Sequence, residues 1–323
     1  KRRNDMDTDN LRENQKSGTK IIKNAKSLSM LAAVTAIFLW STSFVATKIA
    51  YNSFTPLTLG GTRFLLATII LGIIMKITKQ DFKKPSRKDI GYISLSGLLG
   101  ITIFYSMENI GVKLTTASNA ALIVASYPAI TVLIDFLINR KGITLIKGIG
   151  IALAVIGVYQ ITFHSPNQGG SQQLIGSVIL ILAGVAFTFY TFTTSKCVAK
   201  YSLITVSFYQ TLAGTLVFIP LSMLERSSWK IPTIDAVITV LYLGIFCSVI
   251  AFLLYNYGLR NISSGSAVAL LNLVPVFGVI FSVLFLNEVI GIHHLIGGFI
   301  VILGVFLSVL ETNPKQPGGE NHE

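Results

Sequence analysis

Two ionisable side chains, Arg63 and Glu108, lie inside long apolar stretches, where a charge is costly unless it faces the protein interior or water. The guanidinium of Arg63 keeps its proton and suits a carboxylate or a phosphate, so it predicts an anchor for an anionic group. Its alternative role is a structural partner for Glu108 or for helix-end carbonyls. Glu108 is a candidate for proton coupling, because a carboxyl group there can take up and release a proton. Snorkelling to water, or pairing with Lys113 or Arg63, are its other interpretations.

A second set of candidates is uncharged and combines aromatic surface with hydrogen-bonding groups. Trp40 lies halfway along a hydrophobic stretch, too deep for an interfacial belt, so it either lines a pocket or fills the helix bundle. A pocket for a small amphipathic molecule uses a few polar groups among apolar walls. The further candidates for such a pocket are Ser41, Ser43, Tyr105, Asn109, Asn119, Tyr190, Tyr255, Asn256 and Asn272.

Several other chemistries find no support in the sequence. His293 and His294 are adjacent and diverge by about 100° on a helix, so we expect no metal site. The chain has two cysteines without metal spacing, no phosphate loop of the GxxxxGK[ST] type, and no supported Ser–His pairing. We therefore expect no cofactor and no enzyme; a membrane-embedded enzyme acting on lipid is the weakest alternative.

The elements that carry these residues are predicted to be membrane-spanning helices. The chain of 323 residues is 52% hydrophobic and 12% charged, with a mean hydropathy of +0.67. Its apolar blocks are about 20 residues long, which suits the hydrocarbon core of a bilayer, and backbone groups in lipid must bond internally. The ten predicted helices lie near 30–50, 55–76, 89–111, 115–138, 143–163, 173–196, 203–224, 233–257, 263–286 and 290–310.

The chain repeats itself at a constant spacing of about 147 residues. Five helices in each repeat force the second copy to enter the membrane with the opposite orientation. This arrangement is typical of secondary transporters, whose binding site lies where the repeats meet. Small residues, asparagines and prolines keep this register: Asn109, Gly111, Ala120, Pro128, Gly150 and Gly157 recur as Asn256, Gly258, Ala267, Pro275, Gly297 and Gly304.

The net charge of +12 is distributed unevenly along the chain. Basic residues gather in the N-terminal tail, between Lys76 and Lys88, and in two later connections that all lie on one side if the helices alternate. This asymmetry predicts a multi-pass protein of the cell membrane with both termini in the cytoplasm, and it argues against a nucleic-acid partner. The predicted organisation is a disordered basic cytoplasmic tail (1–28), repeats at 29–163 and 173–311, an extracytoplasmic linker (164–172) and a cytoplasmic tail (312–323).

Several sequence blocks keep a recognisable order and spacing: Phe38–Phe44, Pro56 with Thr62–Phe64, Thr115–Ala121 leading to Pro128, Ser263–Ala267 leading to Pro275, Leu286–Glu288, Gly297 and Gly304. Together they resemble the EamA family of the drug/metabolite transporter superfamily over about residues 30 to 310. Three departures are Ser41 where the family usually has Gly, Lys141 where the second repeat has Glu288, and Gln210 where the first repeat has Arg63.

The resemblance implies a carrier of ten helices that moves a small metabolite, with export of amino acids or related compounds as the expected activity. We expect alternating access around a central cavity lined by helices one, three, four, six, eight and nine. Pro128 and Pro275 are the candidate hinges, because proline interrupts a helix. Sugar phosphates, nucleotide-linked metabolites and drugs are the alternative cargoes. The expected partners are the lipid bilayer and a proton or ion gradient, and the chain is expected to act as a monomer or a homodimer.

Overall fold

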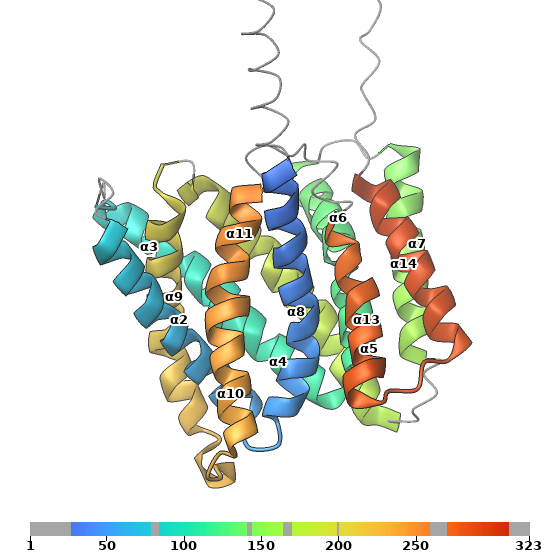
Figure 1. Ribbon diagram of the computed structural model, residues 1–323. Coiled ribbons are helices and arrows are strands. Elements are labelled where there is room, and N and C mark those ends of the chain that lie inside the picture. The colour runs from blue at the N-terminus through green and yellow to red at the C-terminus, as the bar shows by residue number, and fades with distance from the viewer. Residues whose placement is uncertain are drawn as a thin grey trace, which may run out of the picture.

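The computed structural model describes residues 27–78, 84–140, 144–163, 170–198, 200–258 and 270–309, and all regular structure in these ranges is helical (Figure 1). Nearly all of the predicted tails, most of the linker, the small-residue run before Pro275 and the Asn256 side chain lie outside the described residues. The prediction of an all-helical polytopic membrane protein is confirmed. Among the described residues, nine helices are long and apolar enough to cross a membrane, and a shorter apolar helix forms the described part of the tenth.

The first repeat begins with a helix over Ser27–Ala50 and continues through seven further elements. These elements are α2 (Pro56–Thr78), α3 (Arg87–Gly97), the π-helix η1 (Leu98–Ile103), α4 (Phe104–Leu114), α5 (Ala117–Val124), α6 (Tyr127–Asn139) and α7 (Leu145–Phe163). The second repeat comprises α8 (Gly170–Val198), α9 (Leu203–Met223), the short 3₁₀ turn η2 (Arg226–Ser228), α10 (Ile234–Tyr242), the π-helix η3 (Leu243–Ile250), α11 (Ala251–Gly258), α13 (Leu273–Leu286) and α14 (Ile292–Val309).

Short polar side chains set several helix boundaries. Thr116, Ser202 and Thr233 each accept a hydrogen bond from a backbone N–H in the first turn of α5, α9 and α10. At the other ends, Arg140 and Asn287 close α6 and α13 with positive φ angles of 50° and 53°. These two residues occupy equivalent positions of the two repeats, so the repeats share their helix ends as well as their apolar blocks.

The packing shows that the two repeats are related by an inverted pseudo-two-fold axis. Helices α7 and α14 cross so closely that a Cβ on Gly157 would lie 2.7 Å from the carbonyl oxygen of Gly297, and one on Gly150 would lie 2.6 Å from that of Gly304. Each glycine therefore meets the repeat equivalent of the other, which is the reciprocal contact of a two-fold interface. Thr68 marks the axis itself, because it hydrogen-bonds its own equivalent, Thr215, at 3.1 Å.

Four irregular backbone segments interrupt the regular helices, in two equivalent pairs. The π-helices η1 and η3 form one pair, and such segments often occur at functional sites. Helix α5 stops at Val124 before α6 begins, and α13 begins after a turn at Asn272. Pro128 and Pro275 lie in the first turns of α6 and α13, where a missing N–H costs nothing, so the chain breaks just before each proline instead of kinking at it.

The bundle has two ends that differ in the segments they gather (Figure 1). We call the lower end the capped end; it holds the beginnings of α2 and α5 and the ends of α4, α9 and α13. We call the upper end the open end; it holds the start of the first helix, the end of α8, the start of α9 and the end of α14. The first and last described residues, Ser27 and Val309, therefore lie at the same end.

Candidate functional site

A cavity of about 450 Å³ lies in the middle of the bundle between the two repeats. Side chains from both π-helices, from both helix breaks and from the first helix, α8 and α11 line it. The predicted lining by helices one, three, four, six, eight and nine agrees with this arrangement. Helices two and seven, which are α2 and α9, also contribute through Arg63 and Gln210.

The lining follows the pseudo-symmetry of the fold. Most positions that face the cavity in one repeat face it in the other, so the cavity straddles the axis. The two repeats differ in the charge that they place on the wall, however, because Arg63 and Glu108 of the first repeat are its only charged residues among those described. The equivalent pairs that line it include Trp40 with Phe187, Ser43 with Tyr190, Arg63 with Gln210, Tyr105 with Phe252, Glu108 with Tyr255, and Ala125 with Asn272.

Arg63 is 3% exposed and is held by a neighbour in the other repeat. Its Nε donates a hydrogen bond of 2.6 Å to Ser248 Oγ on η3, and its guanidinium carbon lies 4.8 Å from the ring centre of Tyr105. Among the described residues, no carboxylate lies within ion-pair distance of Arg63. The guanidinium is thus oriented by a hydroxyl and an aromatic face and not neutralised by a carboxylate, which leaves its terminal nitrogens suited to an anionic ligand.

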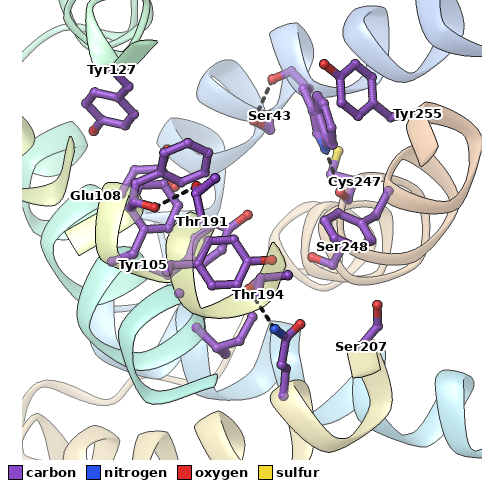
Figure 2. A pocket seen from close by; sticks show the side chains of 18 of the residues that line it. Ser43, Tyr105, Glu108, Tyr127, Thr191, Thr194, Ser207, Cys247, Ser248 and Tyr255 are labelled. Atoms are coloured by element: carbon purple, nitrogen blue, oxygen red, sulfur yellow. Dashed lines mark hydrogen bonds between the residues drawn. The ribbon is translucent and has the colours of Figure 1, made fainter. Parts of the chain in front are cut away.

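Glu108 and Tyr105 lie on one side of the cavity, and Cys247 and Ser248 lie on the other (Figure 2). Glu108 is close enough to feel the charge of Arg63 without bonding to it at ion-pair distance. One cation and one carboxylate therefore face the same space. A ligand that carries both charges could complement both groups.

Trp40 both lines the cavity and joins the repeats. Its indole Nε1 donates to the carbonyl oxygen of Cys247 at 3.1 Å, and its ring centre lies 5.0 Å from that of Tyr255. Ser43 also lines the cavity, whereas Ser41 is fully buried away from it and donates to the carbonyl of Ile37 at 2.7 Å. Of the predicted residues, Tyr105, Tyr190, Tyr255 and Asn272 complete the group that the structure places on the cavity wall.

Two predicted asparagines support helix ends instead of the cavity. Asn109 is 2% exposed and donates from Nδ2 to the carbonyl of Pro56 at 3.0 Å, which joins α4 to the start of α2. Asn119 donates to Thr115 at 3.2 Å and lies 2.6 Å from His294 Nε2. Neither residue is among those that line the cavity, because both face the capped end of the bundle.

Several residues on the cavity wall were not among the sequence candidates. Ser248 orients Arg63, and Gln210 donates from Nε2 to Ser96 at 2.5 Å and to Thr194 at 2.9 Å. The available signal was the repeat spacing, which pairs Gln210 with Arg63. The position of Ser248 depends on the π-helix η3. Neither η3 nor η1, which precedes α4, has a comparable signal in the sequence.

The cavity reaches the open end and stops short of the capped end. Val198 and Leu203, which line it, are the last residue of α8 and the first of α9. Toward the capped end its last lining residues include Arg63, the eighth residue of α2, so about 10 Å of packed helix separates the cavity from that end.

Two carboxylates of the second repeat seal the capped end by bonding to helix starts of the first repeat. Glu225 Oε2 accepts from the backbone N–H groups of Leu57 and Thr58, both at 2.9 Å. Glu288 accepts from the N–H of Ala117 at 2.7 Å and from the N–H and hydroxyl of Ser118 at 3.0 and 2.6 Å. A carboxylate on unpaired N–H groups at a helix start is stabilising, so both contacts hold the repeats together here.

At the open end the contacts between the repeats are exposed and weaker than those at the capped end. Lys200 pairs with Asp89 at 3.1 Å, and Tyr201 donates to the same carboxylate at 2.7 Å. The hydrogen bond from Lys200 to Asp89 raises the pKa of Lys200 above its ordinary value, so the pair stays ionised at neutral pH. Exposed ion pairs contribute little, so this end is held less firmly than the capped end.

No group of three or more His, Cys, Asp or Glu side chains that could hold a metal ion occurs among the described residues. The cavity wall itself carries Glu108 and Cys247 as its potential ligands, on opposite sides.

Comparison with known proteins places both repeats in one family. The model of the EamA-like transporter family matches residues 27–163 and 174–310. The chain is 30% identical over 295 residues to an uncharacterized transporter of Archaeoglobus fulgidus, covering 90% of this chain and 99% of that protein. It is 28% identical over 304 residues to the uncharacterized transporter YetK of Bacillus subtilis, covering 93% and 91%.

Two further likenesses bear on cargo and on fold. A probable terminal-alkyne amino-acid exporter of Streptantibioticus cattleyicolor is 26% identical over 281 residues, covering 87% of this chain and 93% of that protein. A solved crystal structure matches with a TM-score of 0.63 at 19% identity, covering 88% of this chain and 96% of the other. At that identity the match is evidence for the fold alone.

Proposed function

The chain belongs to the EamA-like transporter family, and we propose that it carries a small zwitterionic metabolite, an amino acid or a related compound, by alternating access. The observation that carries this proposal is the pair of opposite charges in the cavity, Arg63 and Glu108, which do not neutralise each other directly. Arg63 would hold the carboxylate of the substrate, and Glu108 would face its ammonium group.

The rest of the cavity suits the body of such a molecule. Trp40, Tyr105, Tyr127, Phe187 and Tyr255 supply aromatic faces around the charged pair. Aromatic and apolar walls with few polar groups are typical of small-molecule sites. A cavity of about 450 Å³ holds a molecule of amino-acid size with room for some water. A sugar phosphate, with its greater charge, would leave Glu108 opposed to an anion.

The shape of the cavity supports alternating access. It is closed at the capped end by Glu225 and Glu288 and extends to the open end. The distribution of basic residues supports a cytoplasmic position of the open end, which we include in the proposal. The conformation described here would then load substrate from the cytoplasm, and release would require the capped end to separate. Export is the direction that this loading favours, and the amino-acid exporter among the relatives supports the cargo class.

Counterflow in proteoliposomes tests the proposal. Purified full-length protein is reconstituted, loaded with one unlabelled amino acid at a time, and exposed to trace labelled amino acid outside. Accumulation with any amino acid, and inhibition by zwitterions in preference to their amides or decarboxylated amines, is the expected result. Accumulation of sugar phosphates without that of any amino acid would overturn the proposal.

Glu108 also remains our candidate for proton coupling, since it is the one carboxyl group on the described cavity wall. Glu108→Gln separates its two roles. If the carboxylate carries the coupling proton, the variant loses flux driven by a pH gradient and keeps counterflow. If it binds only the ammonium group, both activities fall together.

A further inference from the structure

We propose that the cavity contains a second, neutral subsite formed by Ser207, Gln210 and Thr194, which binds a hydroxyl or carboxamide group at the far end of the substrate. This inference rests on the proposed function, because it requires the charged head of the substrate to bind at Arg63. The inference narrows the proposed substrates to amino acids whose apolar side chain ends in a neutral hydrogen-bonding group.

Ser207 provides the first observation. Its side chain is 5% exposed, it lines the cavity, and its Oγ has no hydrogen-bond partner among the described residues. In Figure 2 the hydroxyl of Ser207 points away from its own helix and into the pocket. A buried hydroxyl without a partner is costly, because it has lost its hydrogen bonds to water. Ser41, by contrast, avoids this cost by bonding to a carbonyl one turn back. A ligand group in the cavity would satisfy Ser207.

Gln210 provides the second observation, because its amide is fixed in orientation. Both hydrogen bonds of Nε2 are directed to hydroxyls, one on Ser96 and one on Thr194. With the amide nitrogen so engaged, the amide oxygen of Gln210, which receives no hydrogen bond from the described residues, is the acceptor that remains on this part of the wall. Ser207 and Gln210 lie three residues apart on α9 and therefore on the same helix face. Together they offer one hydroxyl and one carbonyl oxygen.

The subsite lies at a different depth from the charged pair. Arg63 and Gln210 are each the eighth residue of their helices, but α2 begins at the capped end and α9 at the open end. Each is about 10 Å from its own end of a bundle roughly 30 Å deep, so the two positions are separated along the axis by on the order of 10 Å. Glu108 and Ser207 are accordingly well apart in Figure 2.

This separation and the walls between the two subsites define the substrate. The cavity that holds both subsites is lined by rings, including those of Tyr105 and Tyr190. An amino acid that spans both subsites has an apolar or aromatic body, and its tip must both donate and accept a hydrogen bond. Tyrosine and phenylalanine form the sharpest probe pair, because they differ only in the terminal hydroxyl group.

The experiment measures counterflow of labelled tyrosine and labelled phenylalanine by the full-length protein in proteoliposomes. We expect the apparent KM for tyrosine to be about tenfold lower, since one or two neutral hydrogen bonds in a buried site are worth about 1.4 kcal/mol. In Ser207→Ala the advantage of tyrosine should fall to about twofold or less. Ser207→Thr, which keeps a hydroxyl group, should retain it.

Ser177→Ala is the matched control. Ser177 is fully buried on α8 and its Oγ likewise has no partner among the described residues, but it does not line the cavity. This variant should leave the preference unchanged. Equal KM values for the two amino acids in the unmodified protein, or an undiminished tyrosine advantage in Ser207→Ala, would overturn the neutral subsite while amino-acid transport itself stands. Transport of neither amino acid nor any other zwitterion would instead refute the proposed function.

Discussion

The surroundings of Arg63 and of Gln210 can be compared directly, because the two residues occupy the same position in the two repeats. Each backbone packs against a glycine of the other repeat: a Cβ on Gly244 would lie 3.2 Å from Arg63 O, and one on Gly97 would lie 2.9 Å from Gln210 Cα. Each side chain bonds to a serine of that neighbouring segment, Ser248 in one case and Ser96 in the other. The two positions therefore have the same backbone packing and the same kind of hydrogen bond to a serine.

The two regions differ in charge. Arg63 has Glu108 nearby, whereas the residue equivalent to Glu108 is Tyr255, whose ring lies at a tilt beside that of Trp40. The close glycine contacts require both halves to keep the same packing, but the cavity wall is free to vary because ligand or water fills the space beside it. The comparison indicates that the inverted repeat fixes where side chains are presented, and that the residue types then divide the cavity into a charged half and a neutral half.

The largest effect is expected when position 63 is made like position 210. Arg63→Gln should lower counterflow of an amino acid about 100-fold, because two charge-assisted hydrogen bonds to a carboxylate are worth about 3 kcal/mol. The packing should survive, since Gln210 shows that glutamine at this position can donate to a serine. Thermal unfolding of the purified variant, followed by size-exclusion chromatography, checks the fold. Near-normal transport in Arg63→Gln would show that the charge of Arg63 is not needed for binding, so the cavity would have no charged half.

A smaller loss is expected on the neutral side. Gln210→Ala should reduce the transport rate about tenfold, because it removes neutral hydrogen bonds worth about 1 kcal/mol each. Gln173→Ala serves as its control, since Gln173 is a buried glutamine of α8 that does not line the cavity. The two regions would differ less than we propose if Gln210→Ala were as inactive as Arg63→Gln.

The carboxylates at the capped end should affect stability more than binding. Glu288→Gln replaces an oxygen that accepts from α5 and removes the charge at the helix start, at a cost of about 1 kcal/mol. We expect the apparent Tm to fall by about 3 °C. Glu225→Gln should behave alike, and Asp235→Asn, whose carboxylate lies in the first turn of its own helix, should change the Tm less. An unchanged Tm in both glutamine variants would show that these contacts do not hold the capped end.

The smallest effect is expected on the pseudo-two-fold axis, where the repeats are alike. Thr68 donates to the carbonyl of Phe64 at 2.8 Å, so the bond between the two threonines is donated by Thr215. Thr68→Val and Thr215→Val should each lower stability by about 1 kcal/mol or less, and the double variant should lose less than the sum of the two. Thr62→Val, an exposed position with the same bond one turn back, is the control. Strict additivity of the two changes would contradict the contact across the axis.

Much of the fold could be predicted from the sequence, and part of the site. Apolar length and the repeat spacing determine the number of helices and their inversion, and both depend on local or periodic properties of the chain. Four residues were predicted as site candidates because a polar or large amphipathic side chain at membrane depth is unfavourable unless it has a function or a partner. All four line the cavity: Trp40, Arg63, Tyr105 and Glu108. Asn109 was also a pocket candidate, although its equivalence with Asn256 in the repeat favours a structural role; it bonds to a helix end, a partner that the sequence does not specify.

By itself, the sequence determined a ten-helix membrane protein with an inverted repeat, because the bilayer restricts spanning segments to apolar helices. The tertiary structure decided what side-chain types alone could not: which polar groups face the cavity, which of them bond to one another, and which end is closed. Glu225 and Glu288 became caps of α2 and α5 only through contacts between residues more than a hundred positions apart. Such contacts depend on how helices cross, and crossing geometry is set by the packing of both repeats together.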